Sequence, residues 1–350
     1  PPPPIVNRTL VVLPLHASEP DSHLADFLTC TFTAHPPTLA GALFDVRVVL
    51  SGAAPSGGDR PARLGALVEA AVGPGHAVQA AYSHLVDDTY DKDGVRGSAS
   101  SYAGPNAAFY GLMLGGGGAG GGTNSTTTTT STTPGLCPPE AGPGERSTPA
   151  AGRPPPASPP THYTFALFLE SDVCALRAGW LDVALAPLLH KAAFLISGSR
   201  AKVACVANPA APGQPCASTP GAAWPRHARH HINGGAAAYR LSPDLTSLLA
   251  AARDQFEGTV PYDVAAWLVG SALGLAHALH DAPRVVSVVS PVDWGRFADA
   301  AYYGPATRAA LVHAPRRLRV PAAAAVAARL GRPATVAILP DVAGLPTLVH

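Results

Sequence analysis

The sequence predicts an α/β fold built on a doubly wound sheet. Two buried strands alternate with two helices at the start of the chain, and the strongest apolar run ends in two carboxylates. Alternating strands and helices favour a largely parallel sheet with helices on both faces. In such a sheet ligands bind beyond the carboxyl ends of the strands, so polar residues at strand ends are the first candidates for a site.

The first elements alternate strand and helix. Residues 9–15 (TLVVLPL) form a continuous apolar run, as expected for a strand that is buried on both faces. Residues 22–42 are expected to be helical, although two consecutive prolines interrupt them. Residues 44–50 predict a second buried strand, and residues 63–72 have helical spacing. This order is the opening of a doubly wound sheet.

A low-complexity segment then interrupts the pattern. After a turn and a predicted helix in residues 102–110, the chain becomes rich in Gly, then Thr, then Pro. Such a segment cannot bury enough apolar surface to offset the entropy lost on ordering it. We therefore expect residues 111–161 to be a disordered insertion in one domain, whose halves are residues 1–110 and 162–350.

Regular patterns resume after the insertion. Residues 163–169 (YTFALFL) are the strongest strand signal in the chain, and a helix is expected at residues 180–193. Further helices are expected at residues 245–256 and 264–280. The remaining expected strands are residues 194–196, 284–289, 310–313 and 334–339.

Composition narrows the classes of function. The 350 residues suffice for one large α/β domain. The net charge of +1 gives no reason to expect nucleic acid or an anionic membrane surface as a partner. No stretch of about 18 apolar residues occurs, so no bilayer-spanning segment is expected. Because the chain begins with Pro rather than Met, we expect an excised piece, with any signal or anchor outside it.

The cysteines fit no zinc-binding spacing and no C-x-x-C motif. They are Cys30, Cys137, Cys174, Cys205 and Cys216. Cys205 and Cys216 flank a Pro-rich loop and could close a small disulfide. Two N-x-S/T sequons, at Asn7 and Asn124, are glycosylation acceptors only in a secretory compartment, which they favour weakly.

The feature that points most directly to chemistry is an acidic pair, Glu170 and Asp172, immediately after a predicted strand. Two carboxylates at a strand end can hold a hard divalent cation through oxygen ligands. Such a cation would bridge the two phosphates of a nucleotide-sugar and neutralise charge on the departing diphosphate. An isolated E-x-D sequence is a weak signal, because many proteins carry one by chance as a solvated acidic turn.

Four segments, in this order along the chain, resemble GT-A glycosyltransferases. TLVVLPLHASEP resembles their first, nucleotide-binding strand and loop, and SYAGPNAAFY resembles the G-P-N element before the metal strand. FLESDVCALRAGWLD resembles the metal-site strand with its D-x-D-type motif, and HHINGGAAAY resembles the H-I-N-G-N-A-x-Y pattern of one branch. Two positions depart from the family: Glu170 replaces the usual first Asp, and Gly235 replaces the second Asn.

The resemblance implies a Rossmann-like mixed sheet flanked by helices. Residues 1–110 would be the nucleotide-binding half, and residues 162–350 the half with the metal and acceptor sites. It implies an enzyme that moves a sugar from a nucleotide-diphosphate donor to a protein or glycan acceptor, with Mn²⁺ or Mg²⁺ as the divalent metal. It also implies a Golgi, other secretory or extracellular location, with membrane attachment only through an anchor outside this fragment.

The metal ligands follow from the same resemblance. Asp172 is the first candidate, and Glu170 is a second ligand or a ribose contact. His313 matches in position the late histidine that completes the metal site in many of these enzymes. The alternative for His313 is a buried histidine with a purely structural partner.

Candidates for the nucleotide lie in the first half of the chain. His16 and Glu19 follow the first strand, and Asn106 follows a Gly-Pro pair. The alternative for His16 is plain solvation, and for Asn106 it is a helix cap.

Candidates for the sugar and acceptor are His231, Asn233 and Gly234. Glycine lets backbone approach a ligand closely, and Asn both donates and accepts hydrogen bonds. The alternative is a structural turn with its own Asx hydrogen bonds.

Asp263 is the candidate general base, because an inverting transfer needs a carboxylate to take the acceptor's proton. It is equally an N-cap for the following helix.

Other interpretations are open at this stage. A separate transition-metal site could use His227, His230 and His231, but no Cys or further His stands at ligand spacing. Sugar stacking and core packing both suit the tryptophans Trp224, Trp267 and Trp294. For the whole chain the alternatives are an inactive, carbohydrate-binding domain of the same fold and a structural, Pro/Thr-rich matrix glycoprotein.

Overall fold

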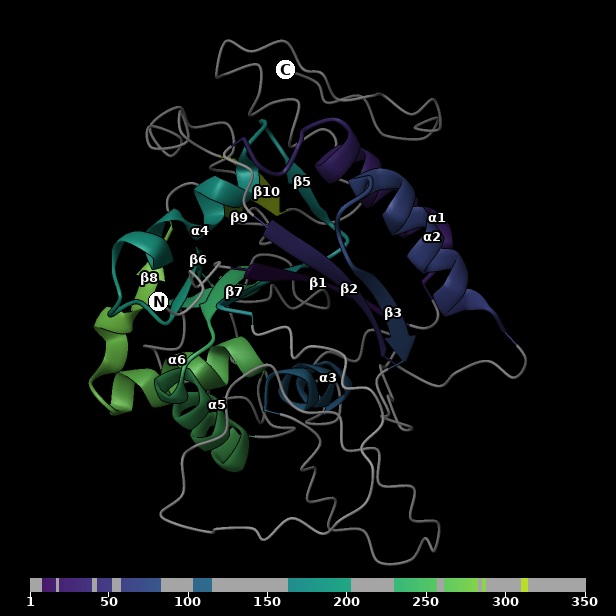
Figure 1. Ribbon diagram of the computed structural model, residues 1–350. Helices are drawn as coiled ribbons and strands as arrows, with labels where there is room; N and C mark the ends of the chain where they lie inside the picture. The colour runs from purple at the N-terminus through teal and green to yellow at the C-terminus, as the bar shows by residue number, and fades with distance from the viewer. Residues whose placement is uncertain are drawn as a thin grey trace, which may run out of the picture.

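The computed structural model of the protein describes parts of both predicted halves (Figure 1). The described residues are 8–16, 19–39, 43–51, 58–82, 103–114, 163–202, 230–256, 261–282, 285–287 and 310–313. Of the expected insertion, only residues 111–114 are described, and they belong to a helix. The two sequons, the pair Cys205 and Cys216, and the strand expected at residues 334–339 lie outside the described residues.

Strands and helices alternate along the chain. The first half contains β1 (Arg8–His16), α1 (Asp21–Leu28), a π-helical turn (Thr29–Thr33), β2 (Leu43–Ser51), α2 (Arg60–Val72), β3 (Val78–Tyr82) and α3 (Ala103–Leu114). The second half contains β4 (Phe165–Leu169), β5 (Val173–Ala175), α4 (Trp180–His190), β6 (Ile196–Lys202), β7 (His230–Arg240), α5 (Pro243–Phe256), α6 (Tyr262–Ala272), a 3-10 turn (Leu275–Ala278), β8 (Leu279–Asp281), β9 (Val285–Ser287) and β10 (Leu311–His313).

The described strands form a seven-stranded mixed sheet in the order β3-β2-β1-β4-β7-β6-β8. β1 pairs in parallel with β2 and β4, and the pairs β2–β3 and β6–β8 are also parallel. β7 runs antiparallel to both of its neighbours. Parallel neighbours need crossover connections, and α1 and α2 lie in the crossovers that join the first three strands. This topology confirms the predicted class, a GT-A-like, Rossmann-like mixed sheet flanked by helices.

Helices cover both faces of this sheet (Figure 1). Helices α1, α2 and α4 pack on the face that carries Val11 and Leu13, whereas α3, α5 and α6 pack on the face that carries Leu10 and Val12. Successive residues of a strand point to opposite faces, so a strand covered on both sides is apolar throughout. This explains why residues 10–15 of β1 and all of β4 are unbroken apolar runs.

A second sheet, of three short strands in the order β5-β10-β9, follows the carboxyl end of β4. β10 is antiparallel to β5 and parallel to β9. A disulfide joins Cys174 of β5 to Cys30 of the π-helical turn, with 5.4 Å between their Cα atoms. The sequence did not predict this pair, because residues so distant in sequence meet only in the folded chain.

Two helices are shorter than their apolar patterns predict. The helix expected over residues 22–42 ends at Leu28 and passes into the π-helical turn, before the two prolines, which have no N–H to donate. The helix expected over residues 264–280 ends at Ala272. Gly274 then takes φ +73°, a left-handed conformation that favours glycine, and the chain continues through the 3-10 turn into β8.

One strand is longer than expected, and another lies in a segment for which no strand was predicted. Ser197-Gly198-Ser199 lies inside β6, beyond the end of the strand expected at residues 194–196, and HHINGGAAAY is part of β7. β6 is bonded on both sides, to β7 and to β8, and this pairing outweighs the turn preference of Ser and Gly. Gly198 is required here, because a Cβ at that position would lie 2.8 Å from Cγ2 of Ile232.

A charged network holds the amino ends of the strands. Asp45 is 2% exposed and accepts hydrogen bonds from Arg8 Nε (2.6 Å), the Ala77 N–H (2.8 Å) and the Tyr163 hydroxyl (3.0 Å). Burial alone raises the pKa of Asp45, but these donors outweigh burial and hold that pKa below its ordinary value. Burial and the hydrogen bond to Asp45 raise the pKa of Tyr163 to about 12.

No helix among the described residues is long and apolar enough to cross a membrane.

Candidate functional site

Glu170 and Asp172 leave the sheet at the carboxyl end of β4. The Glu170 N–H donates to the Gly235 carbonyl of β7 (2.8 Å), and the Val173 N–H donates to the Glu170 carbonyl (3.0 Å). These bonds form the tight turn that leads the chain from β4 into β5. Both carboxylates therefore lie at the edge where an α/β sheet binds its ligands, as the sequence predicted.

His313 reaches the two carboxylates through strand pairing. In the small sheet His313 of β10 lies opposite Val173 of β5, the residue that follows Asp172. Its Nε2 atom lies 2.9 Å from Asp172 Oδ1 and 3.2 Å from Glu170 Oε2. The three side chains are 3%, 23% and 45% exposed for His313, Asp172 and Glu170 respectively. The group is thus buried at the imidazole and open to solvent at Glu170.

This group, which we call the metal group, fits a divalent cation. One ligand atom from each residue lies within 4.8 Å of the others. Burial lowers the pKa of His313, but Asp172 and Glu170 outweigh burial and raise this pKa to about 10. The two carboxylates therefore stabilise positive charge at this point. Carboxylate oxygens with one imidazole nitrogen suit Mn²⁺ and similar ions.

The loop after β1 lies against the same turn. Glu19 Oε2 accepts a hydrogen bond from the hydroxyl of Ser171, which stands between the two acidic residues (3.3 Å). The Glu19 N–H donates to the His16 carbonyl (2.9 Å), so the two predicted nucleotide contacts lie in one tight turn. The structure thus brings this turn to the metal group, while nucleotide binding by His16 and Glu19 stays a prediction.

Asn106 is 1% exposed on α3. Its Oδ1 atom accepts a hydrogen bond from the Tyr262 N–H (2.7 Å). Tyr262 is the first residue of α6, where a backbone N–H has no partner inside the helix. Asn106 therefore caps a helix, as its alternative interpretation held, but the helix is α6 and not its own. The predicted nucleotide contact stays a prediction.

The three residues predicted for the sugar and acceptor lie together on β7. His231 is 5% exposed, and its Nε2 atom lies 3.3 Å from Asp263 Oδ2. Asn233 Oδ1 accepts a hydrogen bond from the Gly235 N–H (2.8 Å), which is the Asx contact that we held as the alternative. The Gly234 N–H donates to Asp263 (2.9 Å). Their contacts with a sugar stay predictions.

Asp263 lies in the first turn of α6 and is 14% exposed. The N-cap of this helix is Pro261, so Asp263 does not hold the N-cap position that we considered. Its carboxylate accepts from the Gly234 N–H and from the Val264 N–H (2.8 Å) and faces His231. Burial raises the pKa of Asp263, but His231 and the two N–H groups outweigh burial and lower it.

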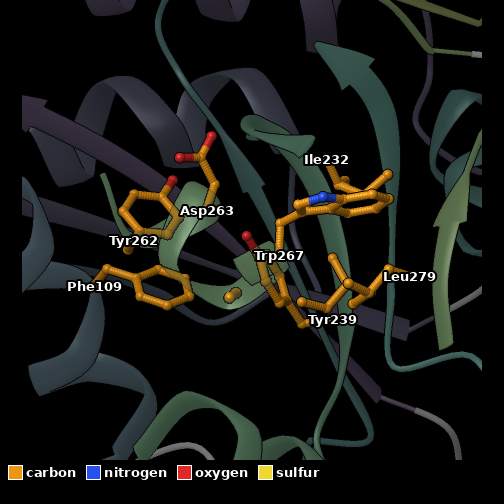
Figure 2. A pocket seen from close by; sticks show the side chains of 9 residues that line it. Phe109, Ile232, Tyr239, Tyr262, Asp263, Trp267 and Leu279 are labelled. Atoms are coloured by element: carbon orange, nitrogen blue, oxygen red, sulfur yellow. The ribbon is translucent and has the colours of Figure 1, made fainter. Parts of the chain in front are cut away.

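A small cavity adjoins Asp263 on the side of the sheet covered by α3, α5 and α6. Figure 2 shows its aromatic walls, with Tyr262 over Phe109 and with Trp267 nearby. The Tyr262 and Phe109 rings stack with centroids 3.9 Å apart. Trp267 therefore packs in the wall of this cavity, whereas the other two candidate stacking tryptophans, Trp224 and Trp294, lie outside the described residues, as does His227.

Three further residues belong to the site. Gly235 lies against Glu170 and His313, Tyr262 lies against Gly234, and Ser171 bonds to Glu19. The adjacent glycines of HHINGG were a signal of close approach by another group. No sequence signal identified Tyr262, because its position depends on how α6 packs on β7.

The mixed, GT-A-like sheet carries an acidic turn and a histidine at its carboxyl edge, and these side chains form a candidate metal centre. The chain matches no protein-family model, and no curated protein matches its sequence.

Solved structures of similar fold include three transferases or synthases. The galactosyltransferase LgtC, in complex with donor and acceptor sugar analogs, is 11% identical, with 87% of this chain and 86% of that chain covered and a TM-score of 0.38. Mouse xyloside xylosyltransferase 1 is 11% identical, with 87% and 97% covered and a TM-score of 0.42. Glucosyl-3-phosphoglycerate synthase from Mycobacterium tuberculosis is 14% identical, with 93% and 81% covered and a TM-score of 0.30. The strand order and strand directions within this chain define its fold.

Proposed function

We propose that the protein is a metal-dependent glycosyltransferase that moves a sugar from a nucleotide-diphosphate donor to a protein or glycan acceptor. One observation carries the proposal: Glu170, Asp172 and His313 converge at the carboxyl edge of a GT-A-like sheet. Three ligands of this chemistry at this edge match what binding of a metal diphosphate requires.

The metal group would hold Mn²⁺ or Mg²⁺ through Asp172, Glu170 and His313. When bound, such a cation neutralises negative charge on a diphosphate leaving group. The chain's own residues supply the rest of the site. The turn containing His16 and Glu19 lies beside the acidic residues and would contact the nucleotide, together with Asn106.

The strand β7 would form the sugar and acceptor side of the site. Its residues His231, Asn233 and Gly234 lie next to Gly235, which touches the metal group. The contacts of Asp263 with backbone and imidazole do not favour our sequence-based assignment of this residue as general base.

We further propose a secretory location, in the Golgi or another oxidising lumen or outside the cell. The disulfide between Cys30 and Cys174 supports this proposal, because disulfides persist in oxidising compartments and are rare in the cytosol.

Calorimetric titration tests the function. A panel of nucleoside diphosphates is titrated with and without Mn²⁺ into wild type, Asp172→Ala and the control Asp254→Ala, which removes an exposed carboxylate on α5. We expect saturable binding that requires Mn²⁺ and Asp172 and that survives in the control. Glycan binding without metal would indicate the inactive carbohydrate-binding alternative. No nucleotide binding by folded protein would contradict the transferase proposal.

A further inference from the structure

The pairing between β6 and β7 is interrupted beside the metal group, while Ala236 of β7 stays paired with Leu169 of β4. Gly198 of β6 pairs with Ala237, and Arg200 pairs with Ile232, so one residue of β6 faces four residues of β7. We call these four, residues 233–236, the β7 bulge. Bulges redirect backbone and side chains and are frequent next to functional sites.

The hydrogen bonds of the β7 bulge come from outside the ladder with β6. The Gly234 N–H donates to Asp263 Oδ2 (2.9 Å), and the Gly235 N–H donates to Asn233 Oδ1 (2.8 Å). The Gly235 carbonyl accepts from the Glu170 N–H (2.8 Å). The bulge is therefore held on one side by the Asp263 carboxylate and on the other by the backbone of a metal-group residue.

The two glycines lie between Tyr262 and the metal group with no room for side chains. A Cβ at position 235 would lie 2.5 Å from Glu170 Oε2 and 2.6 Å from His313 Cε1. A Cβ at position 234 would lie 2.5 Å from the Tyr262 ring. The least costly relief of a clash at position 235 is displacement of the Glu170 carboxylate, since the His313 ring is buried. The position of the bulge thus sets the positions of two metal ligands.

The Asp263 carboxylate is fully engaged in contacts within the protein. Its carboxylate accepts from two backbone N–H groups, of Gly234 and Val264, and faces His231 Nε2 at 3.3 Å. A general base needs an oxygen that can face the acceptor hydroxyl. Here the oxygens already have donors, and the side chain is 14% exposed.

We propose that Asp263 is a positioning residue, which holds the β7 bulge through Gly234 and so presses Gly235 against Glu170 and His313. This inference rests on the proposed function, because it assigns Asp263 to metal binding by the same site and removes it from proton transfer. In this proposal Gly235 transmits the effect of Asp263 to the metal ligands. Gly235 stands where the H-I-N-G-N-A-x-Y pattern has its second Asn.

The test uses Mn²⁺ alone, measured by electron paramagnetic resonance of the free ion, so that it does not depend on activity. We expect Asp263→Ala to weaken Mn²⁺ binding about 10-fold or more, the usual effect of losing a group that orients ligands. Asp263→Asn keeps an oxygen for the Gly234 N–H and should restore most of the affinity. Gly235→Ala should weaken binding as well, and it keeps the test decisive if Asp263→Ala does not fold.

Gly111→Ala is the matched control, because among the described residues no atom outside the backbone of α3 and the two chain neighbours lies within 4 Å of a Cβ at that position. Its Mn²⁺ affinity should equal that of wild type. Wild-type affinity in folded Asp263→Ala and Gly235→Ala would overturn the positioning role alone, whereas no Mn²⁺ binding by wild type would overturn the proposed function as well. Where transfer is measured, kcat of Asp263→Asn at saturating Mn²⁺ should stay within about 10-fold of wild type. A loss of 100-fold or more with Mn²⁺ affinity intact would restore the general-base assignment.

Discussion

The Nε2 atom of His313 lies 2.9 Å from Oδ1 of Asp172, and strand pairing produces this contact. Asp172 directly precedes β5, and the antiparallel β5–β10 pair sets Val173 opposite His313. The carboxylate and the imidazole therefore meet although they come from distant parts of the chain. Removing either side chain should therefore weaken metal binding more than removing an exposed side chain elsewhere on the surface.

Replacing the imidazole should weaken metal binding and the fold together. In His313→Gln one ligand is lost, and Glu170 and Asp172 face each other without a cation between them. We expect Mn²⁺ affinity to fall at least about 10-fold, measured by paramagnetic resonance, and the melting temperature in metal-free buffer to fall. His277→Gln, which replaces an exposed histidine of the 3-10 turn, is the control and should change neither value. Equal Mn²⁺ affinity in folded His313→Gln would exclude His313 as a ligand.

Asn106→Ala should destabilise the protein by about 1–3 kcal/mol, because the buried Tyr262 N–H loses its acceptor. Urea unfolding at neutral pH measures the loss. Asn106→Asp keeps an acceptor at the start of α6 and should recover part of the stability. If Asn106 serves the nucleotide and not the helix, the alanine variant will instead retain its stability and lose nucleotide affinity.

Acid should destabilise the protein partly through Asp45. The folded-state pKa of Asp45 is lowered, so its contribution is fully present above its unfolded pKa of about 3.9 and disappears as pH falls through the folded value. In Asp45→Asn the free energy of unfolding should be lower than in wild type at pH 7, and the difference should shrink below about pH 4. Urea titrations across this range measure it. A difference that is constant with pH would show that the charge of Asp45 contributes nothing.

The disulfide should stabilise the fold by about 2–4 kcal/mol, because it closes a long loop in the unfolded chain. The double variant Cys30→Ala/Cys174→Ala should unfold at lower urea concentration than oxidised wild type. Reducing agent should bring wild type towards the variant and leave the variant unchanged. An identical midpoint for oxidised wild type and the variant would show that this bond does not form in solution.

Much of the fold followed from local patterns. The apolar runs of β1, β2 and β4 are buried on both faces, and such strands are recognisable without knowledge of their neighbours. β3 and β8 escaped prediction because they are short and take their place by pairing at the two edges of the sheet. β7 escaped because Gly and Asn favour turns, and only pairing with β4 and β6 overrides that preference.

For the candidate site, local patterns predicted the acidic pair but not the contacts between distant residues. Glu170 and Asp172 stand at a strand end, and the position of strand ends at the ligand-binding edge is a general property of α/β sheets. The association of His313 with them rested on a resemblance until strand pairing placed it 2.9 Å away. The hydrogen bond from the Tyr262 N–H to Asn106 could not be predicted, because it joins two helices, α3 and α6, that are far apart in the sequence.

The sequence by itself determined the class of fold, the acidic strand end and the glycines at positions 234 and 235, since each depends on residue type and local spacing. The tertiary structure alone decided what these parts do to one another. It made Asn106 a cap for α6, joined Cys30 to Cys174, and placed Gly235 against Glu170 and His313. The physical reason is that neighbouring residues determine the local conformational preference of the chain. Contacts between distant residues, in contrast, arise only when strands pair and helices pack.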